Sequence, residues 1–330
     1  MGSRIVGRRV ASWIAVIAVG VVAGAAGPDR DRAEPLTEPG AFTPGIEGPS
    51  CDAEGNIYAV NFAEQGTIGR VTPEGKGEVF VRLPGESVGN GIVFDSQGMM
   101  FVADYVGHHI LRIDPETRQV EVFAHEPNMN QPNDVAIAPD DTLYASDPKW
   151  SESTGQVWKI STEGQVTKVA ADLGTTNGIE VSPDGKWLYV NESVQRNVWK
   201  FPIQEDGSLG PKQLIRQFPD HGFDGMRCDV DGNLYITRHG KGTVVVMTPE
   251  GGDPPGDRRA GQVPDQSMLR RPRRPNGLCD RGGAHKTRLV PSRKARPGLA
   301  EASATSPIRS RKPSGRLSFF ILTYQYNIEG

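Results

Sequence analysis

Five oxygen-bearing side chains recur at one position of a repeated sequence phrase. The phrase is fifteen residues long, and its five copies begin at Glu47, Asn90, Asn133, Asn177 and Asp224. Carboxylates and amide carbonyls are hard oxygen donors, which suit Ca²⁺ better than Zn²⁺, an ion that prefers histidine and cysteine. The two carboxylates would balance a divalent charge, and the neutral amide oxygens would add ligands without adding repulsion. The alternative is that Asn and Asp only cap a turn before each strand, and the repeat alone does not separate the two interpretations.

The spacing of the phrase predicts the elements that position these side chains. Successive copies start 43, 43, 44 and 47 residues apart, which is typical of a four-stranded propeller blade. Each copy holds an apolar run, a turn rich in Asp and Gly, and a second apolar run. Two further strands follow, for example at 109–115 and 119–124. No segment shows extended helical periodicity, so we predict an all-β propeller.

The hairpin that opens each unit places further polar residues near the leading ones. In an antiparallel hairpin, the start of the first strand and the end of the second lie at the same end of the sheet. Fourteen positions after four of the leading residues come Asp104, Asp147, Asn191 and Arg238. These side chains are expected around one polar mouth, the usual place for a ligand in such a fold.

Residues 47–252 resemble the SMP-30/gluconolactonase/luciferin-regenerating-enzyme family of six-bladed β-propellers. The motifs that carry the resemblance are EGP at 47–49, PNDVAIAPDDTLYASDP at 132–148, TNGIEVSPDGKWLYVNES at 176–193 and DGMRCDVDGNLY at 224–235. The resemblance implies a divalent cation held by Glu47, Asn133, Asn177 and Asp224. Calcium is the expected ion, with Zn²⁺, Mg²⁺ and Mn²⁺ as alternatives. It also implies six four-stranded antiparallel blades, of which the sixth is degenerate or scrambled here.

The activity implied by the resemblance is the opening of sugar lactones, as in a gluconolactonase. A bound cation would polarise the lactone carbonyl, and water would attack it while Asp224 accepts a proton as the catalytic base. Asn90, Asp147 and Asn191 are expected to bind the small-molecule substrate. Two alternatives stay open: a phosphoester or phosphofluoridate hydrolase on the same site, and a non-catalytic binding module that uses calcium for stability.

A second motif suggests another chemistry and is set aside. GESVG at 85–89 matches the G-x-S-x-G pattern of a serine nucleophile, which requires a strand before the serine and a helix after it. An apolar run that reads as a strand follows Ser87, so we expect no catalytic role for this serine.

The N-terminal region reads as an export signal. Arg4, Arg8 and Arg9 precede an uncharged run at 10–27 that ends in small residues. Residues 1–27 are therefore predicted as a signal peptide, 28–44 as a linker and 45–252 as blades one to five. We expect a periplasmic or secreted monomer without stable membrane association after cleavage. An uncleaved membrane anchor is the alternative.

Residues 253–330 break the pattern. They carry 16 Lys and Arg against 6 Asp and Glu, although the whole chain has a net charge of −3, and residues 251–318 lack Phe, Trp and Tyr. This segment is predicted as a degenerate sixth blade or a basic tail of low order. A nucleic-acid or membrane-surface arm, and a reading-frame change that scrambled a blade, are the other interpretations. The acidic body gives no sign of a nucleic-acid partner.

The chain has only three cysteines, which excludes a disulfide scaffold. Cys51 and Cys228 occupy the same position of the repeat, in blades too far apart for a bond between them. Both are expected to be buried free thiols.

Overall fold

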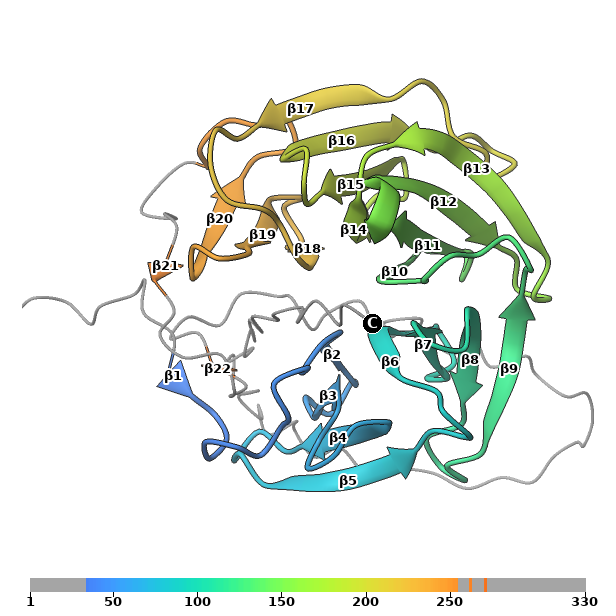
Figure 1. Ribbon diagram of the computed structural model, residues 1–330, viewed down its shortest axis with the longest axis vertical. Helices are drawn as coiled ribbons and strands as arrows, with labels where there is room; N and C mark the ends of the chain where they lie inside the picture. Colours follow the sequence, from blue (N-terminus) through green and yellow to red (C-terminus); the bar gives the residue numbers. More distant parts are fainter. Residues whose placement is uncertain (1–33, 255–260, 263–269, 272–330) are drawn as a thin grey trace, which may run out of the picture.

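Five four-stranded antiparallel sheets follow one another in an arc around a common centre (Figure 1). The computed structural model describes residues 34–254, 261–262 and 270–271. In each sheet the strand order follows the sequence, with the first strand near the centre and the fourth at the rim. The all-β propeller is confirmed, and its described residues form five blades where six were predicted.

The strands of each blade have the following bounds. Blade one contains β2 (Ser50–Cys51), β3 (Ile57–Val60), β4 (Thr67–Val71) and β5 (Gly77–Arg82). Blade two contains β6 (Gly89–Phe94), β7 (Met100–Asp104), β8 (His109–Ile113) and β9 (Val120–His125). Blade three contains β10 (Val135–Ile137), β11 (Leu143–Lys149), β12 (Thr154–Ile160) and β13 (Val166–Leu173). Blade four contains β14 (Thr176–Val181), β15 (Trp187–Glu192), β16 (Asn197–Pro202) and β17 (Gln213–Gln217). Blade five contains β18 (Met226–Cys228), β19 (Leu234–Arg238), β20 (Thr243–Met247) and β21 (Gly261–Gln262).

Burial decreases from the centre of each blade to its rim. Every residue of β3 and β7 is buried, whereas no residue of β17 is. The inner strands are apolar on both faces because a neighbouring blade covers each face, while the outer strands meet solvent. The second apolar run of each phrase forms the second strand of its blade, and nearly every residue of these strands is buried.

The turn in the first hairpin of a blade is built by an aspartate and a left-handed residue. Asp95 Oδ1 accepts hydrogen bonds from the backbone N–H groups of Gln97 and Met99, both 2.8 Å long. Gly98 has a φ of 85°, which glycine adopts without a Cβ penalty. The Asp and Gly of the repeated turn cluster therefore set the hairpin geometry as predicted.

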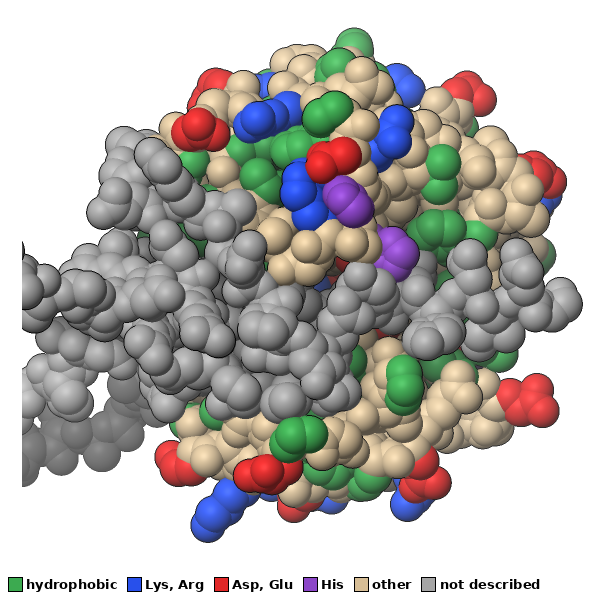
Figure 2. Space-filling view, turned by 60° about the vertical axis from the view of Figure 1, so that its left-hand side comes forward, with side chains coloured by type: hydrophobic (Ala, Val, Ile, Leu, Met, Phe, Trp, Pro, Cys, Tyr) green, Lys and Arg blue, Asp and Glu red, His purple; other side chains and the backbone are tan. Residues whose placement is uncertain are grey.

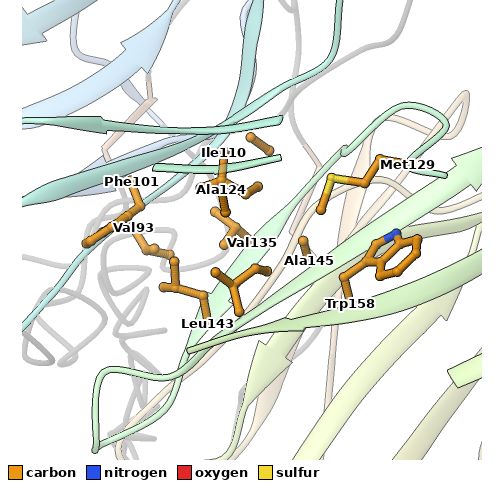
Figure 3. Packing of buried hydrophobic residues seen from close by; sticks show 11 residues of the cluster. Val93, Phe101, Ile110, Ala124, Met129, Val135, Leu143, Ala145 and Trp158 are labelled. Carbon is orange, nitrogen blue, oxygen red and sulfur yellow. The ribbon is translucent and has the colours of Figure 1, made fainter. Parts of the chain in front are cut away.

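Apolar side chains of adjacent blades form the core. Between blades two and three, Phe101 and Ile110 face Val135, Leu143 and Trp158 in one buried cluster (Figure 3). Similar clusters lie between blades one and two, three and four, and four and five. Because each cluster draws on two sheets, no blade has a complete core of its own.

The face of blade one that points away from blade two is covered by the preceding segment. Phe42 and Ile46 are almost fully buried and pack against Ile57, Ala59 and Val71. Residue 42 also forms an antiparallel bridge with residue 62. The end of the predicted linker thus packs on the propeller.

Several predictions concern the ends of the chain. The fourth strand of blade five, β21, lies beyond the predicted boundary at residue 252, and β1 (Glu34–Pro35) pairs with β22 (Arg270–Arg271). The predicted signal peptide and most of the predicted sixth blade and basic tail fall outside the described residues. Within those residues, no helix is long and apolar enough to cross a membrane.

The two predicted thiols have different outcomes. Cys228 is buried and forms no disulfide, as expected. Cys51 is disulfide-bonded, so the prediction of a free thiol there is wrong.

Candidate active site at the inner ends of the blades

The five leading residues of the repeat lie at the starts of the innermost strands, and all are buried. Their exposed fractions are 8% for Glu47, 6% for Asn90, and 2% for Asn133, Asn177 and Asp224. Two of them lie within β6 and β14, and the other three precede β2, β10 and β18. A residue that only capped an exposed turn would stay in contact with water. Burial therefore favours a role inside the molecule.

Blades one, two and three approach one another closely at these residues. The backbone N–H of Gly91 donates a hydrogen bond of 2.8 Å to the carbonyl oxygen of Asn133. Gly48 follows Glu47 with a φ of 55°, and a Cβ on it would lie 1.7 Å from the carbonyl oxygen of Asn90. Only glycine leaves room for this contact. The leading segments of neighbouring blades are therefore in direct contact.

Blades four and five meet in the same way. The carbonyl oxygen of Asp224 accepts hydrogen bonds from the backbone N–H of Gly178 at 3.2 Å and from Asn191 Nδ2 at 2.8 Å. Asn177 Nδ2 donates to Ser193 Oγ at 3.1 Å, so its Oδ1 is the amide atom left to face a cation. These contacts hold Asn177, Asn191 and Asp224 together at one junction.

The second residue of the phrase, to which the prediction gave no role, makes these junctions. It is glycine at Gly48, Gly91, Gly178 and Gly225, and an aspartate only at Asp134. A small residue directly after a polar one, repeated at a fixed period, is the signal that could have revealed the close approach of the blades. The single exception, Asp134, is itself a buried carboxylate.

Asp147 is completely buried, and the chain's own donors surround it. Its carboxylate accepts hydrogen bonds from the backbone N–H groups of Asn130 and Gln131, from Gln156 Nε2 at 2.7 Å and from Trp158 Nε1 at 2.8 Å. A substrate would have to displace these donors to reach it. The contacts favour a structural role, fixing the loop before Asn133, over the predicted substrate contact.

Asp104 plays a similar part in blade two. Its Oδ1 accepts a hydrogen bond of 2.8 Å from the N–H of Gly107, and its Oδ2 lies 2.9 Å from His109 Nε2. Burial alone would raise the pKa of Asp104, but hydrogen bonds from His109, Ser87 and Gly107 lower it below the ordinary value. Ser87 and His109 thus share one carboxylate, and a strand, β6, follows the serine. This is not the arrangement in which histidine activates a serine.

The leading residues fit a hard divalent cation. Glu47 and Asp224 supply carboxylates, and Asn133 and Asn177 supply amide oxygens, a set without nitrogen or sulfur ligands. Around them, four buried polar atoms have no hydrogen-bond partner among the described residues: Asn133 Nδ2, Thr175 Oγ1, Thr176 Oγ1 and Asn191 Oδ1. Such atoms commonly mark a place for water, an ion or a ligand. Among the described residues, no group of three or more His, Cys, Asp or Glu side chains is placed to hold a metal ion.

Tyr105, which follows Asp104 at the end of β7, is a further candidate. Burial raises the pKa of its hydroxyl, a hydrogen bond with Gln131 opposes this, and the nearby negative charge of Glu47 adds to the increase. The hydroxyl therefore stays protonated at neutral pH.

A paired acid and base cluster borders the site on blade five. Arg238 is buried above the ring of Phe218, 4.4 Å from its centroid, and its Nη2 lies 3.0 Å from Asp220 Oδ1. Hydrogen bonds from Lys241 and Arg238 lower the pKa of Asp220 to about 2. On the face shown in Figure 2, basic and acidic side chains of the described residues are likewise interspersed.

Comparisons with known proteins agree with the propeller fold. The family model described as SMP-30/Gluconolactonase/LRE-like region matches residues 41–254. A gluconolactonase of Zymomonas mobilis is 25% identical over 240 residues, which cover 62% of this chain and 67% of that protein. Diisopropyl-fluorophosphatase of Loligo vulgaris is 26% identical over 242 residues, which cover 64% of this chain and 77% of the relative.

A solved structure of regucalcin, described as a calcium-binding protein of Agrobacterium tumefaciens, matches with a TM-score of 0.60. It shares 22% identity, and the match covers 72% of this chain and 80% of that one. At this identity the likeness supports the propeller fold alone.

Proposed function

Because the chain belongs to the SMP-30/gluconolactonase/LRE-like family, we propose that it is a metal-dependent hydrolase that opens sugar lactones. One observation carries the proposal: Glu47, Asn133, Asn177 and Asp224 are buried oxygen donors at the inner ends of four blades. Relatives named gluconolactonase and lactonase support the lactone as substrate.

These four residues would hold a divalent cation, with calcium first among the candidates. When bound, the cation supplies a Lewis acid that stabilises negative charge on the lactone oxygen. The buried amide of Asn177, oriented by Ser193, gives such an ion a fixed ligand. A carboxylate pair in this set balances the divalent charge without further anions.

Asp224 is the residue that we propose to take the proton from the attacking water. Its backbone is fixed by donors from Gly178 and Asn191, so its side chain starts from a constrained position. Asn90 and Asn191 are proposed substrate contacts, and the protonated hydroxyl of Tyr105 is a further donor. We leave Asp147 out of the substrate contacts, because its carboxylate is already occupied.

Hydrolysis measured in a pH-stat tests the proposal directly. The full chain should release acid from glucono-lactone or another member of a small lactone panel, lose this activity with a chelator, and regain it when calcium is added. Calcium binding without hydrolysis of any lactone would favour the non-catalytic module. Hydrolysis that a chelator leaves unchanged would contradict the metal-dependent mechanism.

A phosphofluoridate or phosphoester hydrolase is the second candidate. The relative named diisopropyl-fluorophosphatase, which the match covers more fully than it covers the gluconolactonase, favours it. Adding diisopropyl fluorophosphate to the same assay separates the candidates through the ratio of the two kcat/KM values.

The remaining features of the proposal concern the whole chain. We propose an exported monomer in which residues after β21 supply a sixth, degenerate unit of the ring. Cell fractionation tests the export, and sedimentation tests the monomer.

A further inference from the structure

One buried carboxylate, Asp134, contacts the innermost strands of two other blades. Its Oδ1 and Oδ2 pair with the two terminal nitrogens of Arg227 at 3.2 and 2.9 Å, a two-point contact between residues 93 positions apart. Oδ2 also accepts a hydrogen bond of 3.4 Å from the backbone N–H of Ile179. Asp134 is 4% exposed, so solvent does not compete strongly for these contacts.

Each partner of Asp134 lies next to a proposed metal ligand. Asp134 directly follows Asn133, Ile179 is two residues after Asn177, and Arg227 is three residues after Asp224. One side chain therefore connects the segments that carry three of the four proposed ligands.

Blade two has a glycine where the Asp134 carboxylate needs space. A Cβ at Gly91, the residue after Asn90, would lie 2.4 Å from Asp134 Oδ1. The Asp134 side chain thus fills the space that the glycine of the repeated phrase leaves open. It replaces the glycine that the other four copies have at its own position.

A second buried carboxylate lies near Arg227. Glu180 of blade four, 6% exposed, has its Oε2 4.0 Å from Arg227 Nε. Burial alone would lower the pKa of Arg227, but the charges of Asp134 and Glu180 raise it, so the guanidinium stays charged. The Asp134 side chain is buried, whereas that of Arg227 is 26% exposed. Such a pair is weak evidence for stability as such, and its better-attested role is to fix geometry.

We propose that Asp134 and Arg227 are positioning residues that fix Asn133, Asn177 and Asp224 relative to one another, so that the cation site is formed before the cation binds. The proposal rests on the proposed function, because it assumes that these residues are ligands. It adds two residues that contact neither substrate nor cation.

The test measures calcium binding by titration calorimetry on the full chain, well below the melting temperature of each variant. Arg227→Lys keeps the charge but loses the two-point contact. We expect its calcium Kd to rise about 10- to 100-fold, as is usual when a residue that orients a ligand is changed. Asp134→Asn keeps the size of the side chain and should raise the calcium Kd by a similar factor. It replaces Arg227→Lys in the test if the arginine variant does not fold.

Two further measurements separate positioning from stability. Ile113→Ala, a core change in blade two far along the sequence from every ligand, should lower the melting temperature but keep the wild-type Kd. Terbium bound in place of calcium should show more coordinated water in the Asp134 and Arg227 variants, from luminescence lifetimes in H₂O and D₂O.

The outcomes are distinct. Variants with a lower melting temperature but the wild-type Kd and wild-type terbium hydration would overturn the positioning role alone. A wild-type chain that binds neither ion would overturn this inference together with the metal-dependent function.

Discussion

At the scale of single residues, the two carboxylates of the proposed cation site are expected to differ in role. Glu47→Gln and Asp224→Asn each remove one negative charge, so both should weaken calcium binding. Only Asp224 is proposed to accept a proton. At saturating calcium, Asp224→Asn should therefore have a kcat about 10²- to 10⁴-fold below wild type, and Glu47→Gln should retain much more activity.

The measurement is kcat for the lactone that the wild type hydrolyses best, with the calcium Kd of each variant determined first. Equal losses in the two variants would mean that Asp224 acts only as a ligand. Full rate and full affinity in Asp224→Asn would remove it from the site.

The lowered pKa of Asp104 predicts a pH-dependent contribution to stability. The charged form is favoured in the folded protein, so the contribution is present above the ordinary pKa of 3.8 and is lost as the pH falls through the lower, folded value. At pH 7 Asp104→Asn should lower the free energy of unfolding by about 1–3 kcal/mol. The difference from wild type should shrink below about pH 4.

Denaturant unfolding at several pH values checks this, with Ser87→Ala as the matched variant that removes one donor to the same carboxylate. Ser87→Ala should show a smaller change of the same sign and keep full hydrolase activity. Loss of activity in Ser87→Ala at unchanged stability would instead indicate that Ser87 is a catalytic nucleophile.

At the scale of elements, the contact between blades one and two depends on one glycine. Gly48→Ala places a methyl group against a carbonyl of the next blade and forces a left-handed backbone on alanine. Overpacking of about 1–3 kcal/mol and backbone strain of about 1 kcal/mol should together lower the free energy of unfolding by about 2–4 kcal/mol.

Gly98→Ala is the control, because Gly98 is also left-handed but has no atom within 4 Å of the place that an added methyl group would take. It should cost only the strain of about 1 kcal/mol. If chemical denaturation shows equal losses in the free energy of unfolding for Gly48→Ala and Gly98→Ala, the backbone around Gly48 can move to accommodate the added methyl group.

The blades could be predicted from sequence because their local signals repeat. The alternation of apolar runs and Asp-Gly turns located most of the strands of blades one to five. The contacts of Asp147 could not be predicted in this way, since its donors Gln156 and Trp158 lie on β12, whose identities follow no repeated phrase. The pairing of Asp134 with Arg227 was equally hidden, because it joins blades that are not adjacent in the sequence.

At the scale of the whole molecule, the segment before blade one is expected to stabilise the propeller. Phe42→Ala removes a side chain that is 2% exposed and leaves a cavity against Ile57 and Val71. The loss should be about 3–5 kcal/mol. Val122→Ala on the rim, where the residue is 54% exposed, should change stability by less than about 0.5 kcal/mol.

Thermal and denaturant unfolding of these two variants distinguish a packed segment from a simple tether. If Phe42→Ala is as stable as wild type, the segment before blade one acts only as a tether. The sequence suggested a tether because residues 28–44 are rich in proline and charge, and the apolar contacts of Phe42 depend on where the chain enters the sheet.

The packing of Phe42 and Ile46 on blade one also bears on how the protein is made. Chains fold from the N-terminus as they leave the ribosome, and both faces of blade one are covered by residues before position 121. Contacts between residues close in sequence form early, because closing a short loop costs little entropy. The first blade can therefore acquire its partners while most of the propeller is still untranslated, and its outward apolar face need not wait, exposed to aggregation, for the last residues to be synthesised.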